Sequence, residues 1–239
     1  MKALILAGGK GTRFMEESSI KPKPMIEINR KPMLLHIIDH YLLHNVTNFI
    51  VLAGYKIEYF FEYFKVDQFN NTTYKKANIK ILDTGMETQT GGRIKRALDY
   101  VDEEFFLTYG DGLSNVNITK LIKHHRRYKK LATVTAVRPP ARFGSLTISN
   151  NMVINFAEKS NTSSGWINGG YFVFNRKIID YIDGDNSALE EKPLKTLANT
   201  NNLSAFKHSG FWYPVDTIRE KEIVEKMIKD NKLPWVDDK

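Results

Sequence analysis

The sequence predicts an α/β protein with a mostly parallel sheet in a three-layer, Rossmann-like arrangement. Short apolar runs alternate with amphipathic helical segments through the first 137 residues, as right-handed βαβ crossovers require. A glycine-rich loop, "LAGGKGTRF", leaves the first apolar run, and a later run ends at an aspartate in "LTYGDG". Both features stand at the carboxyl ends of expected strands, where open α/β sheets bind ligands.

The elements of the first half follow from hydropathy spacing. Apolar Leu34, Ile38, Tyr41 and Leu42 recur at helical spacing after the glycine loop, which predicts a strand, a loop and a helix in that order. The same alternation then repeats. We expect strands at 2–6, 48–54, 78–83, 104–109 and 131–137, and helices at 31–45, 57–64, 91–101 and 117–130.

The pattern changes after Pro139-Pro140 to short β-like pieces. We expect that this half extends the same sheet and adds a small β-rich lobe. The chain is therefore one domain, 1–239, made of an α/β half (1–137), a β-rich half (138–217) and a C-terminal helix (218–239). The expected strands are 143–148, 152–158, 166–174, 203–208 and 210–216, and the helices 176–183, 188–200 and 217–230.

Composition narrows the classes of function. The 239 residues include no cysteine, which excludes disulfides, thiolate metal sites and cysteine nucleophiles. No apolar run approaches the roughly 20 residues of a membrane span, and the N-terminus lacks the apolar core of a signal peptide, so we expect a cytoplasmic protein. The net charge of +8 suits nucleic acid, an anionic membrane surface or phosphorylated substrates. Charge alone does not choose among these.

The glycine loop predicts phosphate binding. Glycines after a strand let backbone N–H groups approach phosphate oxygens, and nearby Lys and Arg side chains add charge-assisted bonds. Lys10 is followed by Gly11 rather than Ser or Thr, so this is not a P-loop, and GxGxxG does not fit either. A tight strand-to-helix connection is the plain alternative. Thr12-Arg13 and the "KPKPM" that follows favour the phosphate role.

Two basic or metal-like patterns have simpler explanations. His36, His40 and His44 recur every four residues on one expected helix, but they span more than two turns and cannot converge on one ion. We expect a partly exposed histidine stripe. The run "HHRRYKK" at 124–130 ends another helix, where cationic side chains are favourable, so it does not by itself predict a nucleic-acid site.

Several blocks together resemble a known family. "GGKGTR" and "KPKPMIEI" resemble the signature of the sugar-1-phosphate nucleotidylyltransferases. "TGGRIKRALDYV", "LTYGDG", "PPARFGSL", "WINGGYFVF" and "HSGFWYPVDT" bring the chain closer to the glucose-1-phosphate cytidylyltransferases of that family. The blocks run from residue 1 to about residue 217. The sequence departs from the family in a shorter 65–78 segment and in "EKS" (158–160), where Glu-Lys-Pro is usual.

The resemblance implies a nucleotide-diphospho-sugar transferase fold and a set of catalytic residues. Arg13 would hold the β- and γ-phosphates, and Lys23 would stabilise charge on the α-phosphate. Asp111, also catalytic, and Asp216 would hold Mg²⁺, a hard ion suited to carboxylate and phosphate oxygens. The plain alternative for Asp216 is an N-cap of the last helix.

The resemblance also divides the site between the two halves. The first half would bind the nucleotide, with segment 84–93 approaching the base, and 138–217 would bind the sugar and complete the metal site. The plain alternative to a nucleotide-binding role for Arg93 is an arginine on a helix surface. The plain alternative to a phosphate-binding role for Lys159 is a solvated charge in a loop. The nucleotide-binding set is Leu6, Gly8, Gly9, Gly11, Thr12, Arg13, Lys23, Thr84, Gly91, Arg93 and Gly110. The substrate-binding set is Tyr109, Gly144, Glu158, Lys159, Asn168, Gly169 and Asp216.

The function implied is transfer of CMP from CTP to a sugar 1-phosphate, most simply α-D-glucose 1-phosphate. The products are CDP-glucose, a precursor for surface polysaccharide, and pyrophosphate. Two alternatives stay open. The same chemistry could use another pair, such as GTP with a heptose 1-phosphate, or CTP with a non-sugar phosphate. The chain could instead be a noncatalytic nucleotide- or nucleic-acid-binding module, although a binding module needs no pair of metal carboxylates.

We expect no nucleic-acid or membrane partner. The partners would be CTP and the sugar phosphate. The aromatic segment 57–64 leaves open whether the chain forms a homo-oligomer through this helix or buries the helix against its own sheet.

Overall fold

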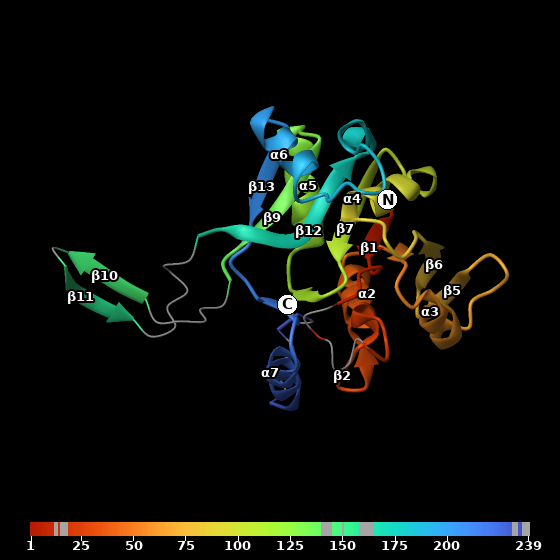
Figure 1. Cartoon of the computed structure of the whole chain (residues 1–239), viewed down its shortest axis with the longest axis horizontal. Coiled ribbons are helices and arrows are strands. Elements are labelled where there is room, and N and C mark those ends of the chain that lie inside the picture. Colours follow the sequence, from red (N-terminus) through yellow and green to blue (C-terminus); the bar gives the residue numbers. More distant parts are fainter. Residues whose placement is uncertain are drawn as a thin grey trace.

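The computed structural model describes residues 1–11, 14, 19–139, 145–149, 151–157, 165–230 and 234–235, and for 145–148 and 155–157 it describes the backbone alone. Within these ranges an eight-stranded sheet has the order β13-β9-β12-β7-β1-β4-β6-β5 (Figure 1). The strands are β1 (Ala3–Leu6), β4 (Asn48–Ala53), β5 (Asn71–Tyr74), β6 (Ala77–Asp83), β7 (Glu104–Tyr109), β9 (Ala132–Val137), β12 (Ile167–Asn175) and β13 (Leu203–Lys207).

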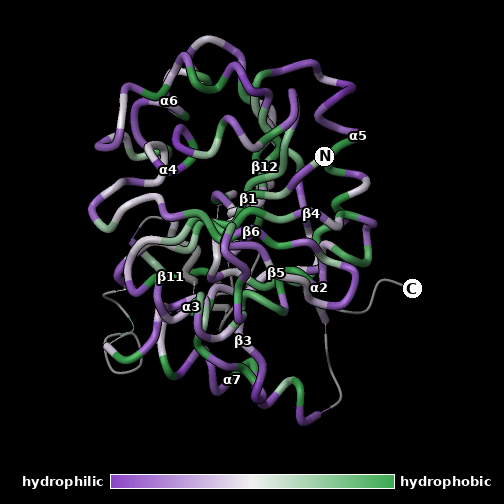
Figure 2. The backbone as a smooth tube through the Cα atoms, turned by 90° about the vertical axis from the view of Figure 1, so that its right-hand side faces the viewer, coloured by the Kyte–Doolittle hydropathy of each residue, from purple (hydrophilic) through white to green (hydrophobic). Residues whose placement is uncertain are grey.

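Strand directions agree with the predicted mostly parallel sheet. The pairs β7–β1, β1–β4, β4–β6 and β13–β9 are parallel. β12 runs antiparallel between β7 and β9, and β5 runs antiparallel to β6 at the edge. The second half therefore extends the first sheet, as expected. Figure 2 shows hydrophobic residues along the central strands and hydrophilic ones on the outer turns.

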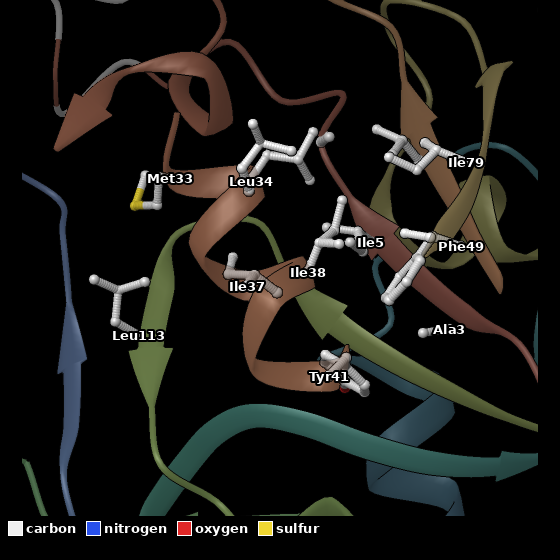
Figure 3. Close-up of a cluster of buried hydrophobic side chains, with 14 of the residues drawn as sticks. Ala3, Ile5, Met33, Leu34, Ile37, Ile38, Tyr41, Phe49, Ile79 and Leu113 are labelled. Atoms are coloured by element: carbon white, nitrogen blue, oxygen red, sulfur yellow. The ribbon is translucent and has the colours of Figure 1, made fainter. Parts of the chain in front are cut away.

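Helices cover both faces of the sheet, because its central strands are apolar on both sides. All four residues of β1 are buried, as in a parallel sheet covered twice. Ile5 joins a core with α2, where Ile38 lies beside it (Figure 3), while Leu4 joins a second core on the opposite face. The α/β three-layer prediction is confirmed. The first face carries α2 (Met33–Leu43), α3 (Ile57–Phe64) and α5 (Ile118–Tyr128), and the second α4 (Thr90–Arg96), η3 (Leu98–Tyr100), η4 (Arg176–Tyr181) and α6 (Lys192–Asn199).

Smaller elements complete the described chain. The hairpin β10 (Ser145–Ser149) and β11 (Met152–Ala157) is drawn away from the main sheet in Figure 1 and corresponds to the expected β-rich lobe. The others are η2 (Lys23–Met25), β2 (Glu27–Ile28), β3 (Lys31–Pro32), β8 (Gly112–Ser114), β14 (Trp212–Pro214) and α7 (Ile218–Lys229). The sugar-binding role of the lobe, and the division of the chain at 137 and 217, stay predictions.

Some element types and boundaries differ from the sequence expectation. The predicted helix 91–101 is α-helical only to Arg96 and continues as the 3₁₀ turn η3, and the predicted helix 176–183 is also 3₁₀. The predicted helix 188–200 begins at Lys192, next to Pro193, because proline is favoured in a first helical turn. Strand β5 was not expected, since its sequence "NTTY" carries no apolar alternation.

The expectation of a partly exposed histidine stripe is wrong for two of its three members. His36 is 7% exposed and His40 4% exposed. Their Nε2 atoms hydrogen-bond the carbonyls of Ile28, at 3.1 Å, and Val116, at 2.9 Å. The buried Trp235 ring also packs edge-on against His36. Helix α2 is therefore covered on the side that faces away from the sheet as well.

The aromatic helix α3 is only partly absorbed by the core. Phe60 is fully buried, while Tyr63 is 43% exposed, so the helix packs on the sheet and still presents an aromatic surface. In the described part of the chain, no helix is long and apolar enough to cross a membrane.

Candidate active site

A pocket of about 300 Å³ opens where β1 and β7 end. Leu6 and Tyr109 pair across these two strands, so the glycine loop and the "YGDG" turn leave the sheet side by side. This is the edge at which parallel α/β sheets bind ligands. The lining residues are Leu6, Ala7, Gly8, Gly9, Gly11, Lys23, Pro24, Thr88, Gln89, Thr90, Arg93, Tyr109, Gly110 and Asp111.

The glycine loop rests on a buried arginine. Arg93 comes from α4, is 4% exposed and donates from Nη2 to the carbonyl of Gly8 at 2.9 Å. A Cβ added at Gly8 would lie 2.0 Å from Nη1 of Arg93, so this position accepts only glycine without rearrangement. Gly11 has a φ of +63°, a conformation that glycine adopts at little cost.

Arg93 ties three loops together at the floor of the pocket. Burial lowers the pKa of its guanidinium, although an arginine remains protonated. The helix-surface alternative is wrong, and a direct nucleotide contact stays a prediction. Its other acceptors are the Ala53 carbonyl (3.1 Å), Thr84 Oγ1 (2.6 Å), the Gly85 carbonyl (2.8 Å) and the Met86 carbonyl (3.3 Å).

Within segment 84–93 the pocket wall is formed by residues that sequence reasoning missed. Thr84 is fully buried and donates to the carbonyl of Ala53 at 2.5 Å. The N–H of Gly91 donates to the carbonyl of Ser187 at 2.8 Å. Neither Thr84 nor Gly91 belongs to the lining. Thr88, Gln89 and Thr90 line the pocket together with the predicted Arg93, and the approach of this segment to the base stays a prediction.

Lys23 lies at the centre of the charged part of the site. It begins the 3₁₀ turn η2, where Pro22 and Pro24 restrict the backbone, and it is 7% exposed. Its Nζ donates to Asp111 Oδ2 at 2.7 Å and also to Asp216 Oδ1. The three predicted residues are thus in direct contact, and one buried ammonium compensates both carboxylates.

The approach of Asp216 to Asp111 results from the pairing of two short strands. β14 pairs antiparallel with β8, with Pro214 opposite Gly112, and the N–H of Val215 donates to the carbonyl of Asp111 at 2.9 Å. The N-cap alternative for Asp216 is wrong, because the cap of α7 is Thr217, whose hydroxyl accepts from the N–H of Glu220. The Asp216 carboxylate instead accepts from Lys23 in the site.

The donor set suits a divalent cation carried by a phosphate substrate. Among the described residues, no group of three or more His, Cys, Asp or Glu side chains could hold a metal ion. In the site itself the carboxylates of Asp111 and Asp216 both contact the Lys23 ammonium. Mg²⁺ is commonly held by one or two carboxylates together with substrate phosphates and water. Asp111 and Asp216 therefore fit the role of metal ligands.

Two residues predicted to bind the sugar phosphate, Asn168 and Gly169, lie near a residue that sequence reasoning missed. Asn168 on β12 donates from Nδ2 to the hydroxyl of Tyr109 at 3.0 Å, and the carbonyl of Gly169 accepts from Trp212 Nε1 at 2.7 Å. The Tyr109 hydroxyl donates to Glu190 Oε1 at 2.5 Å. Burial and the Glu190 carboxylate raise the pKa of Tyr109 well above its ordinary value. Nothing local in "SALEEKPL" pointed to Glu190.

Five predicted residues cannot be placed. Thr12, Arg13, Gly144, Glu158 and Lys159 lie outside the described residues. Their assigned roles stay predictions, as does the effect of Ser160 in the "EKS" departure, which also lies outside.

Comparisons with known proteins agree with this geometry. Residues 2–224 match the family model described as Nucleotidyl transferase. The chain is 44% identical to a glucose-1-phosphate cytidylyltransferase of Salmonella typhi over 255 aligned residues, covering 98% of each chain. It is 41% identical to a probable glucose-1-phosphate cytidylyltransferase of Bacillus subtilis over 252 aligned residues, covering 98% of this chain and 99% of the relative.

A solved structure supports the fold independently. The crystal structure of HddC from Yersinia pseudotuberculosis superposes with a TM-score of 0.73 at 26% identity, covering 95% of this chain and 99% of that one. The family match spans the glycine loop, the Lys23–Asp111–Asp216 cluster and most of the sheet. The chain therefore belongs to the nucleotidyl transferase family.

Proposed function

We propose that this enzyme transfers CMP from CTP to α-D-glucose 1-phosphate, giving CDP-glucose and pyrophosphate. The single observation that carries the chemistry is the buried ammonium of Lys23 between two carboxylates beside the glycine loop. The choice of CTP and glucose 1-phosphate is supported by relatives of 41% and 44% identity that are named for this reaction. CDP-glucose would then serve as a precursor for surface polysaccharide.

The reaction is a displacement at phosphorus. A phosphate oxygen of the acceptor attacks the α-phosphorus of CTP, the new P–O bond forms, and the bond to the β-phosphate oxygen breaks to release pyrophosphate. Both reactants are anions, so the enzyme must position them in line and compensate their charge. The charged and backbone groups around the pocket supply both functions.

Each part of the pocket has a place in this proposal. The loop around Gly8 and Gly9 receives the triphosphate on its backbone N–H groups. Lys23 compensates charge that develops on the α-phosphate, and Arg13 holds the departing phosphates. Asp111 and Asp216 would hold Mg²⁺, which would supply further charge neutralisation at the phosphates when bound. Thr88, Gln89 and Thr90 border the nucleotide on the side of α4.

The acceptor would occupy the side of the site formed by β12. Asn168 and Gly169 are its described residues, and Glu158 and Lys159 would complete it. Phosphorylated substrates would also be consistent with the net charge of +8, so the proposal needs no nucleic-acid partner.

Pyrophosphate release tests this proposal. The assay crosses CTP, UTP, dTTP, GTP and ATP with glucose 1-phosphate, a heptose 1-phosphate and a non-sugar phosphate, each with Mg²⁺ and with chelator. We expect metal-dependent release confined to CTP with glucose 1-phosphate. Release with another pair would contradict the proposed substrates and leave the proposed chemistry standing. No release with any pair would contradict the proposal that the chain catalyses nucleotidyl transfer.

A further inference from the structure

Four polar side chains from four separate parts of the fold form one hydrogen-bonded chain across the site. Thr90 begins α4, Glu190 precedes α6, Tyr109 ends β7 and Asn168 lies on β12. The Thr90 hydroxyl donates to Glu190 Oε2 at 2.7 Å, and the Tyr109 hydroxyl donates to Glu190 Oε1 at 2.5 Å. Asn168 Nδ2 donates to the Tyr109 hydroxyl at 3.0 Å. Glu190 thus connects the nucleotide side with the acceptor side.

The carboxylate sets the direction of every bond in this chain. A carboxylate accepts hydrogen bonds and a tyrosine hydroxyl has one hydrogen to donate, so Tyr109 must donate to Glu190. The same hydroxyl can then only accept from Asn168, which turns the amide nitrogen of Asn168 toward Tyr109. The N–H of Gly170 donates to Asn168 Oδ1 at 2.8 Å, and this bond requires the same amide orientation.

The orientation decides what Asn168 offers to a substrate. One hydrogen of its Nδ2 is used by Tyr109, and the amide group carries a second one. Its oxygen is engaged by Gly170. Asn168 therefore has a second amide hydrogen to donate, which suits a phosphate or hydroxyl oxygen of the acceptor that the proposed function places beside it.

We propose that Glu190 is a positioning residue that determines acceptor affinity by holding Tyr109 and the Asn168 amide in this orientation. The inference rests on the proposed function, because that function places the sugar phosphate beside Asn168. Glu190 is exposed and does not line the pocket, whereas Tyr109 does. Glu190 therefore acts through Tyr109 and touches no reacting atom.

Bracing of the loop before α6 does not require Glu190. The N–H of Gln89 donates to the carbonyl of Asp185 at 2.8 Å, and Gly91 donates to Ser187 at the same distance. The Asp185 carboxylate also pairs with Arg96 at 2.6 Å. The N–H of Leu189 holds the Thr90 hydroxyl at 2.8 Å. Removing the Glu190 carboxylate leaves these hydrogen bonds in place. The pocket-lining residues Thr88, Gln89 and Thr90 should therefore keep their positions.

The test compares Glu190→Ala with Glu191→Ala in steady-state assays of pyrophosphate release. Glu191 is the adjacent exposed carboxylate and makes no capping hydrogen bond, so its variant controls for the lost charge. We expect Glu190→Ala to raise the KM for glucose 1-phosphate by about tenfold, the cost of one misplaced hydrogen bond. The KM for CTP and kcat should stay near the Glu191→Ala values. Glu190→Gln retains an acceptor oxygen for Tyr109 and should restore most of the acceptor affinity.

A double-mutant cycle separates this role from a general structural one. Tyr109→Phe removes the hydroxyl through which Glu190 acts, so Glu190→Ala added to Tyr109→Phe should raise the acceptor KM no further. Additive effects would overturn the proposal, as would equal KM changes for both substrates or no change in the acceptor KM. If wild-type enzyme is not saturated by glucose 1-phosphate, the proposed function itself fails. That failure is visible in the wild type and is distinct from a failure confined to the Glu190 variants.

Discussion

Lys23 and Asp111 lie 88 residues apart in the sequence and form an ion pair of 2.7 Å between Nζ and Oδ2. Asp216 contacts the same ammonium from the far end of the chain. The pairing of β8 with β14 makes this convergence possible, because it brings the last described strand against the turn that follows β7. The charged centre therefore depends on the completed fold and on no single segment.

Replacing Lys23 by alanine should abolish most turnover and leave the protein folded. Loss of one preorganised charge at the reacting phosphate typically lowers the rate by about 10²- to 10³-fold. Lys21→Ala is the matched control, because Lys21 lies in the same "KPKP" and pairs with Glu27 at 3.3 Å. Turnover measured under saturating substrates should fall in the first variant alone. Near-wild-type turnover of Lys23→Ala would contradict the mechanism.

The same variant should bind a divalent cation more tightly when no nucleotide is present. The Lys23 ammonium and a metal ion compete for the two carboxylates, so removing the ammonium should strengthen Mn²⁺ binding. Titration followed by electron paramagnetic resonance measures the free Mn²⁺. We expect tighter binding in Lys23→Ala than in wild type, and loss of that binding when Asp111→Asn is added. Unchanged or weaker Mn²⁺ affinity would show that the carboxylates are not the shared site.

Replacing Arg93 by alanine should destabilise the fold. Its guanidinium is buried and bonded to carbonyls of three loops, so we expect a loss of about 3 kcal/mol in the free energy of unfolding. Arg96 on the same helix forms an exposed pair with Asp185, and Arg96→Ala should cost at most about 1 kcal/mol. Urea unfolding measures both. Equal losses would mean that Arg93 does not support the pocket floor.

Two glycines of the same loop should respond differently to alanine. A Cβ at Gly8 would lie 2.0 Å from the Arg93 guanidinium, whereas nothing lies within 4 Å of a Cβ at Gly9. Gly8→Ala should therefore lower the unfolding temperature, and Gly9→Ala should leave it almost unchanged. Calorimetry without ligands isolates this effect from nucleotide binding. Similar unfolding temperatures for the two variants would contradict the close contact at Gly8.

The buried histidines should make stability depend on pH. Burial, helped by the nearby Lys31 ammonium, lowers the pKa of His36 to about 4. Burial, helped by the nearby His44, lowers the pKa of His40 to about 4. The unfolded chain then binds more protons between about pH 4 and 6.5, so stability falls as pH decreases through this window. At pH 5 the loss is about 2 kcal/mol per histidine.

Urea unfolding between pH 7.5 and 5 checks this dependence. His36→Gln should flatten it by removing one of the two buried histidines, and adding His40→Gln should flatten it further. A stability that does not fall toward pH 5 would show that His36 and His40 do not remain neutral in the folded protein.

Sequence reasoning was most reliable where a signal is local. The alternation of apolar runs located the central strands and α2, α3 and α5, because both faces of the sheet needed an apolar residue at nearly every position. The polar edge strand β5 gave no such signal. Pro193 shows how one residue shifts a helix start that periodicity alone places several residues too early.

The site was predictable by residue type and less so by contact. A carboxylate at a strand end pointed to Asp111, and the family resemblance pointed to Lys23, but burial depends on what packs from elsewhere in the chain. The burial of Arg93 depends on three loops that contact it, two of which are distant from it in the sequence. The burial of His36 and His40 depends on the segments that cover the outer side of α2. Glu190 contacts Tyr109 from 81 residues away, and no local pattern could reveal that pairing.

The most direct test of the central claim follows the phosphorus atoms of CTP. The enzyme is incubated with glucose 1-phosphate, Mg²⁺ and CTP labelled with ³²P at either the α or the γ position, and the products are separated by chromatography. The account predicts α-label in CDP-glucose and γ-label in pyrophosphate. Transfer of the γ-label to the sugar, or absence of α-label from any sugar product, would contradict it.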